Sequence, residues 1–181
     1  ETAVTCTNGT LPMTEDFSNW SSIISCWDSV DNNLDNFKWV IQDLDGGNPC
    51  LVSESYSSSS SNPDGFLNPD NWIISYPIDL RSYSNGDLIE LTWRARGVNS
   101  NLADENYSVY ASTGNQISDF ESSSVVFNEI IGQNGGAGIY ADKTMNLSSL
   151  AGNIIYIAFR HHNMASAQYK LSIDDIQIST S

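Results

Sequence analysis

Basic residues are scarce in this chain, whose 181 residues include 7 Lys and Arg against 22 Asp and Glu, a formal net charge of −15. Nucleic acids and anionic membrane surfaces are bound through clustered Lys and Arg, so this composition argues against both partners. The sequence also lacks any apolar run near the roughly 20 residues that span a bilayer. Hydrophobic residues still make up 40% of the chain, enough for a core. We therefore expect one soluble, acidic domain over residues 1–181 without membrane insertion.

Cysteines are few, and none of Cys6, Cys26 and Cys50 forms the CxxC pair of a zinc or thioredoxin-like site. An odd count allows one disulfide and one free thiol. We favour Cys6–Cys26, which would tie down an N-terminal arm over residues 1–13, and keep Cys26–Cys50 as the alternative. There is no initiator Met, and Lys is scarce while Ser and Asn are abundant. The sequence therefore predicts a secreted or cell-surface location, with this chain a monomeric module of a larger protein.

Long helical periodicity is missing, and the dominant hydrophobic period is two. Residues 88–96 alternate apolar and polar side chains, which predicts a half-buried strand. Further strands are expected at 107–111, 154–161 and 169–173, separated by turn-forming clusters of Asn, Pro, Asp and Gly. Asp119 and Glu121 lie in a Ser-rich stretch, where we expect a solvated loop. Many short strands between turns predict an all-β fold, an antiparallel β-sandwich.

The alternation breaks at Asp174-Asp175, because Ile173 and Ile176 both belong to apolar series but have opposite parity. A β-bulge would cause such a slip and would aim both carboxylates at one place. Two adjacent buried charges are unfavourable without a cation between them. The pattern therefore predicts a calcium ion bound at the bulge.

Two other acidic groups extend this hypothesis. Asp31, Asn33 and Asp35 present alternate oxygen side chains, as in the first half of a calcium loop, and Glu15 and Asp16 lie at the start of the first expected strand. The alternative for these acids is solvated surface charge. We expect at least one structural calcium to connect the N-terminal acids to the bulge. The candidate ligands are Glu15, Asp16, Asp31, Asn33, Asp35, Asp174 and Asp175.

Four segments together resemble one known family. Residues 68–75 (NPDNWIIS) are similar to a signature of cleaved adhesin domains, found in the haemagglutinin regions of gingipain proteases. Residues 105–115 (ENYSVYASTGN), 156–161 (YIAFRH) and 173–176 (IDDI) resemble further motifs of that family in the same order. The wider superfamily includes choice-of-anchor J domains and, more distantly, MAM domains. The resemblance implies a jelly-roll sandwich, calcium binding and a non-catalytic role within a modular secreted bacterial protein.

The resemblance also bears on the acidic residues. It places Glu15, Asp31, Asn33, Asp35, Asp174 and Asp175 at the family's metal-associated positions. The chain departs from the family at Ser18, where an acidic residue often follows the first-strand Phe. It departs again at Leu34 and Asn36, where the family's acidic loop carries Gly.

Candidate ligand-binding residues come from the aromatic and basic side chains. Trp20 and Tyr56 lie in polar segments and are the aromatic rings that we expect to be exposed, whereas Trp27, Trp39, Trp72 and Trp93 are expected to be structural. Arg94 and Arg96 lie on the polar face of one strand. If the strand that ends near Arg160 joins the same sheet, these cations could bind a uronate or sulfate. The alternative is that Arg94 pairs with Glu90 or a neighbouring acid.

Catalytic motifs have little support. His161 and His162 are adjacent in a strand and point to opposite faces, and no nucleophile elbow, HExxH or glycosidase-type carboxylate pair has a suitable context. Our first hypothesis is a calcium-stabilised adhesion or targeting module that binds a polysaccharide or other glycan. The second is a module that binds a host or matrix protein, or a spacer. The third is an enzyme with an unrecognised site.

Overall fold

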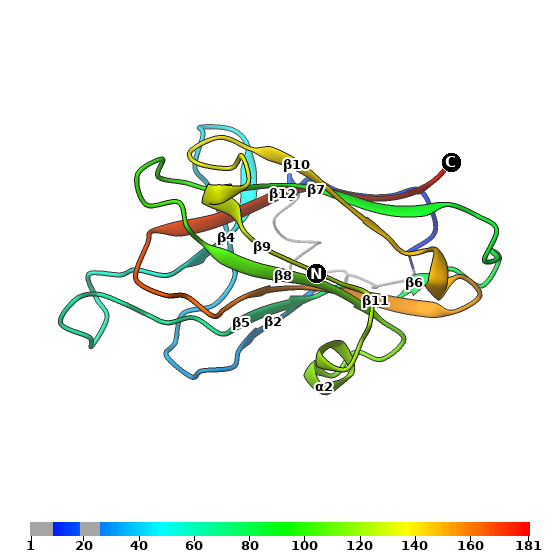
Figure 1. Cartoon of the computed structure of the whole chain (residues 1–181), viewed down its shortest axis with the longest axis horizontal. Helices are drawn as coiled ribbons and strands as arrows, with labels where there is room; N and C mark the ends of the chain where they lie inside the picture. The colour runs from blue at the N-terminus through cyan, green and yellow to red at the C-terminus, as the bar shows by residue number, and fades with distance from the viewer. Residues whose placement is uncertain (1–8, 19–25) are drawn as a thin grey trace, which may run out of the picture.

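Two antiparallel sheets pack face to face in the computed structural model, which describes residues 9–18 and 26–181 (Figure 1). The first sheet has the order β10-β7-β12-β4-β3, with β1 alongside β12, and the second has the order β2-β5-β11-β8-β9, with β6 alongside β11. The first-sheet strands are β1 (Met13–Glu15), β3 (Val40–Asp43), β4 (Pro49–Glu54), β7 (Ile89–Gly97), β10 (Ala141–Asn146) and β12 (Lys170–Thr180). The second-sheet strands are β2 (Asp28–Asp31), β5 (Asn71–Ile74), β6 (Ile78–Asp79), β8 (Asn106–Ser112), β9 (Val126–Ile130) and β11 (Ile154–His161). The predicted β-sandwich is confirmed.

The core lies between the sheets and follows from the alternation in the sequence. In β7, every second side chain from Ile89 onward is buried, and Trp93 packs edge-on against Phe127 and Phe159 of the second sheet. The Trp93 indole Nε1 donates a hydrogen bond to Tyr107 Oη at 3.0 Å, so its one polar atom is also satisfied inside the core. The outward side chains of β7 are consequently free to form a surface.

The predicted break at Asp174-Asp175 is confirmed as a bulge in β12. The pairing of β12 with β7 shifts register between Asp174 and Gln177, and Asp175 has a φ of 47°, in the left-handed region. The extra residue keeps Ile173 and Ile176 in the core while Asp175 is exposed. This kink turns the Asp175 carboxylate toward β7.

A short helix that the sequence did not predict covers the outer side of the second sheet. Helix α2 (Ile117–Glu121) places the buried Phe120 6.0 Å from the Trp72 ring and 6.5 Å from the Tyr110 ring, between centroids. The loop that the sequence predicted here is therefore wrong, although Glu121 is exposed, as expected. Asp119 Oδ2 accepts a hydrogen bond from Gln116 N at the start of the helix, and Glu121 pairs with Arg160 at 3.3 Å.

The remaining elements are two 3₁₀ turns, η1 (Ile131–Gln133) and η2 (Ser148–Leu150). Cys50 is buried and carries a free thiol, so the alternative disulfide Cys26–Cys50 is wrong. Cys6 lies outside the described residues, and the pairing Cys6–Cys26 stays a prediction. Across residues 9–18 and 26–181, none of the helices has both the length and the apolar character needed to cross a bilayer.

Candidate functional site

The N-terminal acids meet the β12 bulge, as the calcium hypothesis requires. Strand β1 pairs with β12 so that Glu15 lies opposite Ile176, and Glu15, Asp16 and Asp175 line one pocket of about 360 Å³. Glu15 is buried, with Oε1 accepting a hydrogen bond from Phe17 N at 2.7 Å. Burial, as the largest cause, and the charges of Asp16 and Asp174 together raise the pKa of Glu15 to about 7, although the hydrogen bond from Phe17 lowers it in part. This carboxylate therefore lacks electrostatic compensation.

Asp174 is fully buried at the same bulge. Its Oδ1 accepts a hydrogen bond from Asp175 N at 2.8 Å and its Oδ2 one from Asn48 Nδ2 at 2.9 Å, yet burial keeps its pKa above the usual value. Arg94 lies 3.5 Å from Asp174 and 2.6 Å from Asp175. The Arg94 guanidinium thus lies close to both Asp174 and Asp175, whereas no Lys or Arg of the described residues pairs with Glu15.

The acidic loop after β2 does not join this cluster. Asp31 accepts hydrogen bonds from Asp35 N and Asn36 N, Asp35 accepts one from Phe37 N, and the Asn33 amide donates to Asp35. These side chains therefore use their oxygens for hydrogen bonds within their own loop, residues 31–37. Leu34 and Asn36 both have positive φ, at 59° and 69°. Glycine adopts such angles without strain, which explains why the family has Gly at these two positions.

The fit of this chain to calcium is consequently partial. Glu15, Asp16, Asp174 and Asp175 supply the hard oxygen ligands that calcium prefers. Within the described residues, however, no group of three or more His, Cys, Asp or Glu side chains is arranged to hold a metal.

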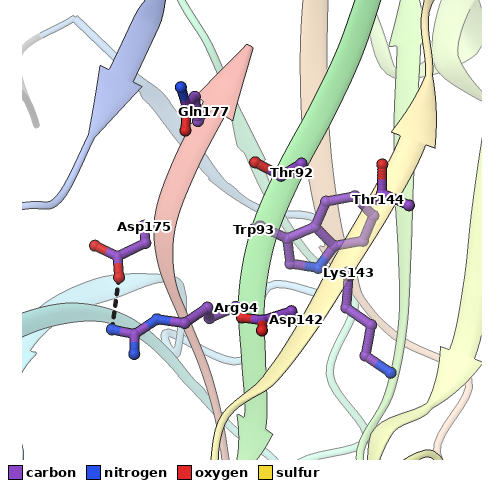
Figure 2. Close-up of a pocket in the computed structure, with 8 residues that line it drawn as sticks. All are labelled: Thr92, Trp93, Arg94, Asp142, Lys143, Thr144, Asp175 and Gln177. Carbon is purple, nitrogen blue, oxygen red and sulfur yellow. Dashed lines mark ion pairs between the residues drawn. The ribbon is translucent and has the colours of Figure 1, made fainter. Parts of the chain in front are cut away.

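A polar groove of about 440 Å³ lies on the outer face of the first sheet, formed by strands β10, β7 and β12 (Figure 2). Its side chains follow the register of the sheet. Thr144 and Gln177 both lie opposite Thr92, and Asp142 and Asp174 both lie opposite Arg94. Figure 2 shows Gln177, Thr92 and Thr144 side by side on three strands, with the Arg94–Asp175 ion pair next to them. The groove therefore contains one polar row that spans three strands.

Most polar groups of the groove have no internal partner. In the part of the chain that the structure describes, the side chains of Thr92, Thr144, Gln177 and Asp142 form no hydrogen bond or ion pair. Three of them are exposed, and Thr92 is half-buried. The row therefore offers two hydroxyls, an amide and a carboxylate to a ligand.

The predicted basic patch does not form, because Arg94 and Arg96 lie in the first sheet and Arg160 lies in β11 of the second. Arg96 pairs with Asp45 at 2.7 Å, and Arg160 pairs with Asp70 at 2.6 Å. The guanidinium carbons of Arg94 and Arg96 lie 4.8 and 4.4 Å from the centre of the Tyr140 ring. Both arginines are thus neutralised and packed, as the alternative interpretation of Arg94 expected, although its partners are Asp174 and Asp175 rather than Glu90.

The aromatic expectations are confirmed where the structure describes them. Trp27, Trp39, Trp72 and Trp93 are buried, whereas Tyr56 is 38% exposed. Tyr56 packs against Gly65 and is not part of the groove. Trp20 lies outside the described residues.

Sequence analysis missed Thr92, Thr144, Gln177 and Asp142. The alternation along β7 was the available signal, because Thr92 and Arg94 are two residues apart and therefore lie on the same polar face of the strand. Cross-strand register brings the four residues together, and periodicity along one strand does not reveal it.

Two of the family-like segments contact each other inside the fold, through Glu105 of residues 105–115 and His161 of residues 156–161. Fully buried His161 contacts Ser53 through Nδ1 at 2.8 Å and Glu105 through Nε2 at 2.9 Å, and this chain of contacts joins the two sheets. All three side chains are inaccessible to solvent, so a substrate could not reach this serine–histidine–carboxylate arrangement. It ties the sheets together.

Known proteins similar to this chain include gingipains and solved adhesin domains of Lys-gingipain. Gingipain R1 of Porphyromonas gingivalis is 30% identical over 186 residues, which is 94% of this chain and 10% of that protein. The chain thus spans about a tenth of the length of such relatives. The K1 cleaved adhesin domain of Lys-gingipain from P. gingivalis W83 matches with a TM-score of 0.72 at 28% identity, covering 92% of this chain and 96% of that one. A family 11 carbohydrate-binding module of a Clostridium thermocellum cellulase shares the fold, with a TM-score of 0.52 at 11% identity over 94% and 96% of the two chains.

The family model named Cleaved Adhesin Domain matches residues 10–178, nearly the whole of the described fold. The resemblance carried by the four sequence motifs is thereby confirmed, and this chain belongs to the Cleaved Adhesin Domain family.

Proposed function

We propose that this chain is a non-catalytic, calcium-stabilised module of a secreted bacterial protein, and that it binds a polysaccharide at the groove on the first sheet. The observation that carries the proposal is the row of unpartnered polar side chains across β10, β7 and β12. Sugar hydroxyls both donate and accept hydrogen bonds, and the Thr hydroxyls and the Gln177 amide do the same. A rigid sheet holds these groups in place before a ligand arrives, which lowers the cost of binding.

The family membership supports the role of a binding module. The relatives carry the names gingipain and hemagglutinin, and these names favour adhesion at a cell surface or outside the cell. We extend that location to this chain as part of the proposal. A protein partner remains the second hypothesis from the sequence, and the first experiment separates the two.

That experiment is a glycan array in the presence of calcium. We expect binding to a class of polysaccharides, and we expect the double variant Thr92→Val, Thr144→Val to lose most of it, because valine keeps the shape and removes the hydroxyl. Thr113→Val is the matched control, since Thr113 is exposed in the turn before α2. A blank array with folded protein would contradict glycan binding and favour a protein partner.

Calcium would be held by Glu15 and Asp174 in this proposal, with Asp16 and Asp175 beside them. The ion would supply positive charge to buried carboxylates that have too little of it. Chelation in a binding assay therefore needs a folding control, because loss of a structural ion would abolish binding indirectly.

A further inference from the structure

We infer that the groove selects uncharged glycans and rejects chains that carry uronate or sulfate groups, and that Asp142 determines this preference. The inference rests on the proposed function, because it concerns the ligand of the same groove. It replaces the anionic ligand that the sequence suggested for Arg94 and Arg96.

The lining of the groove carries two cations and two carboxylates, but both cations are paired and Asp142 is the lining charge without a partner among the described residues. Arg94 is its one guanidinium, and that group is paired with Asp175 at 2.6 Å and lies 3.5 Å from Asp174. Lys143 also borders the groove, but its Nζ pairs with Glu129 at 2.9 Å and its side chain is only 11% exposed. Asp142 and Asp175 are both exposed. An anionic ligand would therefore meet carboxylates without a free cation to bind it.

No other Lys or Arg of the described residues lies at this groove to compensate. All seven Lys and Arg residues lie in the described ranges, and six of them form ion pairs. The remaining one, Lys38, borders a different groove between β2 and β3, together with Trp27 and Trp39. No unpaired Lys or Arg therefore lies at the polar row.

Asp142 differs from the other acids of this surface because it has no partner. It lies opposite Arg94 in the register of β10 and β7, but Arg94 turns toward Asp175 on the other side (Figure 2). A free carboxylate accepts hydrogen bonds on both oxygens and donates none. Neighbouring hydroxyls of an uncharged sugar can donate to it, whereas a uronate or sulfate brings like charge and further acceptors.

The polar row fits a ligand that lies across the strands. Neighbouring strands are about 4.8 Å apart, so Thr144, Thr92 and Gln177 together span about 10 Å. Each of these side chains can donate and accept. The row therefore suits consecutive hydroxyls of a neutral chain, and Asp142 lies on the same strand as Thr144, two residues away.

The test is affinity electrophoresis in gels that contain matched neutral and anionic polymers. The pairs are hydroxyethylcellulose with carboxymethylcellulose, and methyl-esterified polygalacturonate with polygalacturonate, with a polymer-free gel as reference. We expect a neutral member to retard the wild type while its anionic partner does not. Retardation by a neutral polymer should stay constant between about 50 and 500 mM NaCl, because screening acts on charges.

Reversing the charge of Asp142 tests the role of this residue in the selectivity. Asp142→Lys should gain at least about tenfold in affinity for the anionic member of the pair, and Asp142→Asn should stay within a few-fold of wild type for the neutral member. Asp28→Lys is the matched control, because Asp28 is also an exposed, unpartnered Asp on an edge strand, but in the second sheet.

The outcomes distinguish a failure of glycan binding from a failure of the selectivity for uncharged glycans. Retardation by none of the polymers would overturn glycan binding itself. Equal or stronger retardation by the anionic polymers, or the same gain for Asp28→Lys as for Asp142→Lys, would overturn the selectivity while glycan binding stands.

Discussion

The two outer faces of this sandwich differ: the outer face of the second sheet is covered, and that of the first sheet is open to solvent. On the second sheet, the outward side chains Trp72, Ile74, Tyr110 and Ala158 are buried, because Phe120 of α2 completes a small second core with them. On the first sheet, the outward Thr92, Thr144 and Gln177 face a groove without internal partners. One face is closed by an insertion between β8 and β9, and the other is left open.

The difference separates a face whose side chains contribute to stability from the face that we propose binds a ligand. The Trp72 ring stacks on Tyr110 at 5.2 Å and carries the Arg160 guanidinium at 4.6 Å, so aromatic rings that could have held a sugar are used for packing. The open face has hydrogen-bonding groups instead, with Tyr140 as the neighbouring aromatic residue. Mutations on the two faces should therefore have separable effects on folding and on binding.

The largest expected effect is on the closed face. Phe120→Ala should lower the free energy of unfolding by about 4 kcal/mol, since it empties a fully buried site in contact with Trp72. Urea unfolding monitored by Trp fluorescence measures the change. Ile139→Ala is the control, because this side chain is 66% exposed and should cost less than about 0.5 kcal/mol. A loss below about 1 kcal/mol for Phe120→Ala would contradict a second core.

The closed face should also be sensitive to pH. His162 Nε2 contacts Ser108 Oγ at 2.8 Å on this side, and burial, together with the charge of Arg160, lowers the pKa of His162 to about 4. The unfolded chain binds this proton at a pKa near 6.5, so the stability contribution is present above about pH 6.5 and is lost as the pH falls toward 4. Wild type should lose about 3 kcal/mol over that range that His162→Gln does not lose. Equal pH profiles of unfolding for the two proteins would contradict the assignment.

The carboxylate cluster, next to the open face, should respond to calcium. Removing calcium from a level 100-fold above its dissociation constant should lower the free energy of unfolding by about 2.7 kcal/mol. Thermal unfolding with and without chelator measures this effect. The variant Glu15→Gln, Asp174→Asn should no longer respond, whereas Asp31→Asn should retain most of the response. A melting temperature that chelator leaves unchanged in wild type would contradict the calcium proposal.

The smallest effect on folding is expected on the open face itself. Thr92→Val should change the free energy of unfolding by less than about 0.5 kcal/mol, because the hydroxyl has no partner to lose. It should still weaken glycan binding about fivefold, the equivalent of one hydrogen bond of about 1 kcal/mol. Calorimetric titration of folded variants checks both halves. Large destabilisation with unchanged binding would reverse the roles of the two faces.

The sequence predicted more of the fold than of the site, for a physical reason. Burial has a period along one strand, so Ile89, Trp93 and the slip at Asp174 could be read locally. A site that crosses three strands depends on register, and the proximity of Thr144, Thr92 and Gln177 is set by pairing between distant segments. Helix α2 was missed because a five-residue helix among serines has no periodicity, and its Phe120 finds its partners only in the folded sheet.

The carboxylates show an intermediate case. The N-terminal Glu15 was expected near Asp174, and the pairing of β1 with β12 brings them together. Asp31, Asn33 and Asp35 had the same composition but use their oxygens to close a loop. Residue type alone could not separate an acid that needs a cation from an acid that already has backbone donors.

The most direct test of the account is an NMR titration of the backbone amides with cellohexaose and β-1,4-galactohexaose. The account predicts that shift changes produced by the binding sugar concentrate at Thr92, Asp142, Thr144 and Gln177, and that the amides around Trp72, Tyr110 and Phe120 stay unchanged. Shift changes centred on Trp72 and α2, with the amides of β10, β7 and β12 unaffected, would show that the closed face binds the ligand and would contradict the central claim.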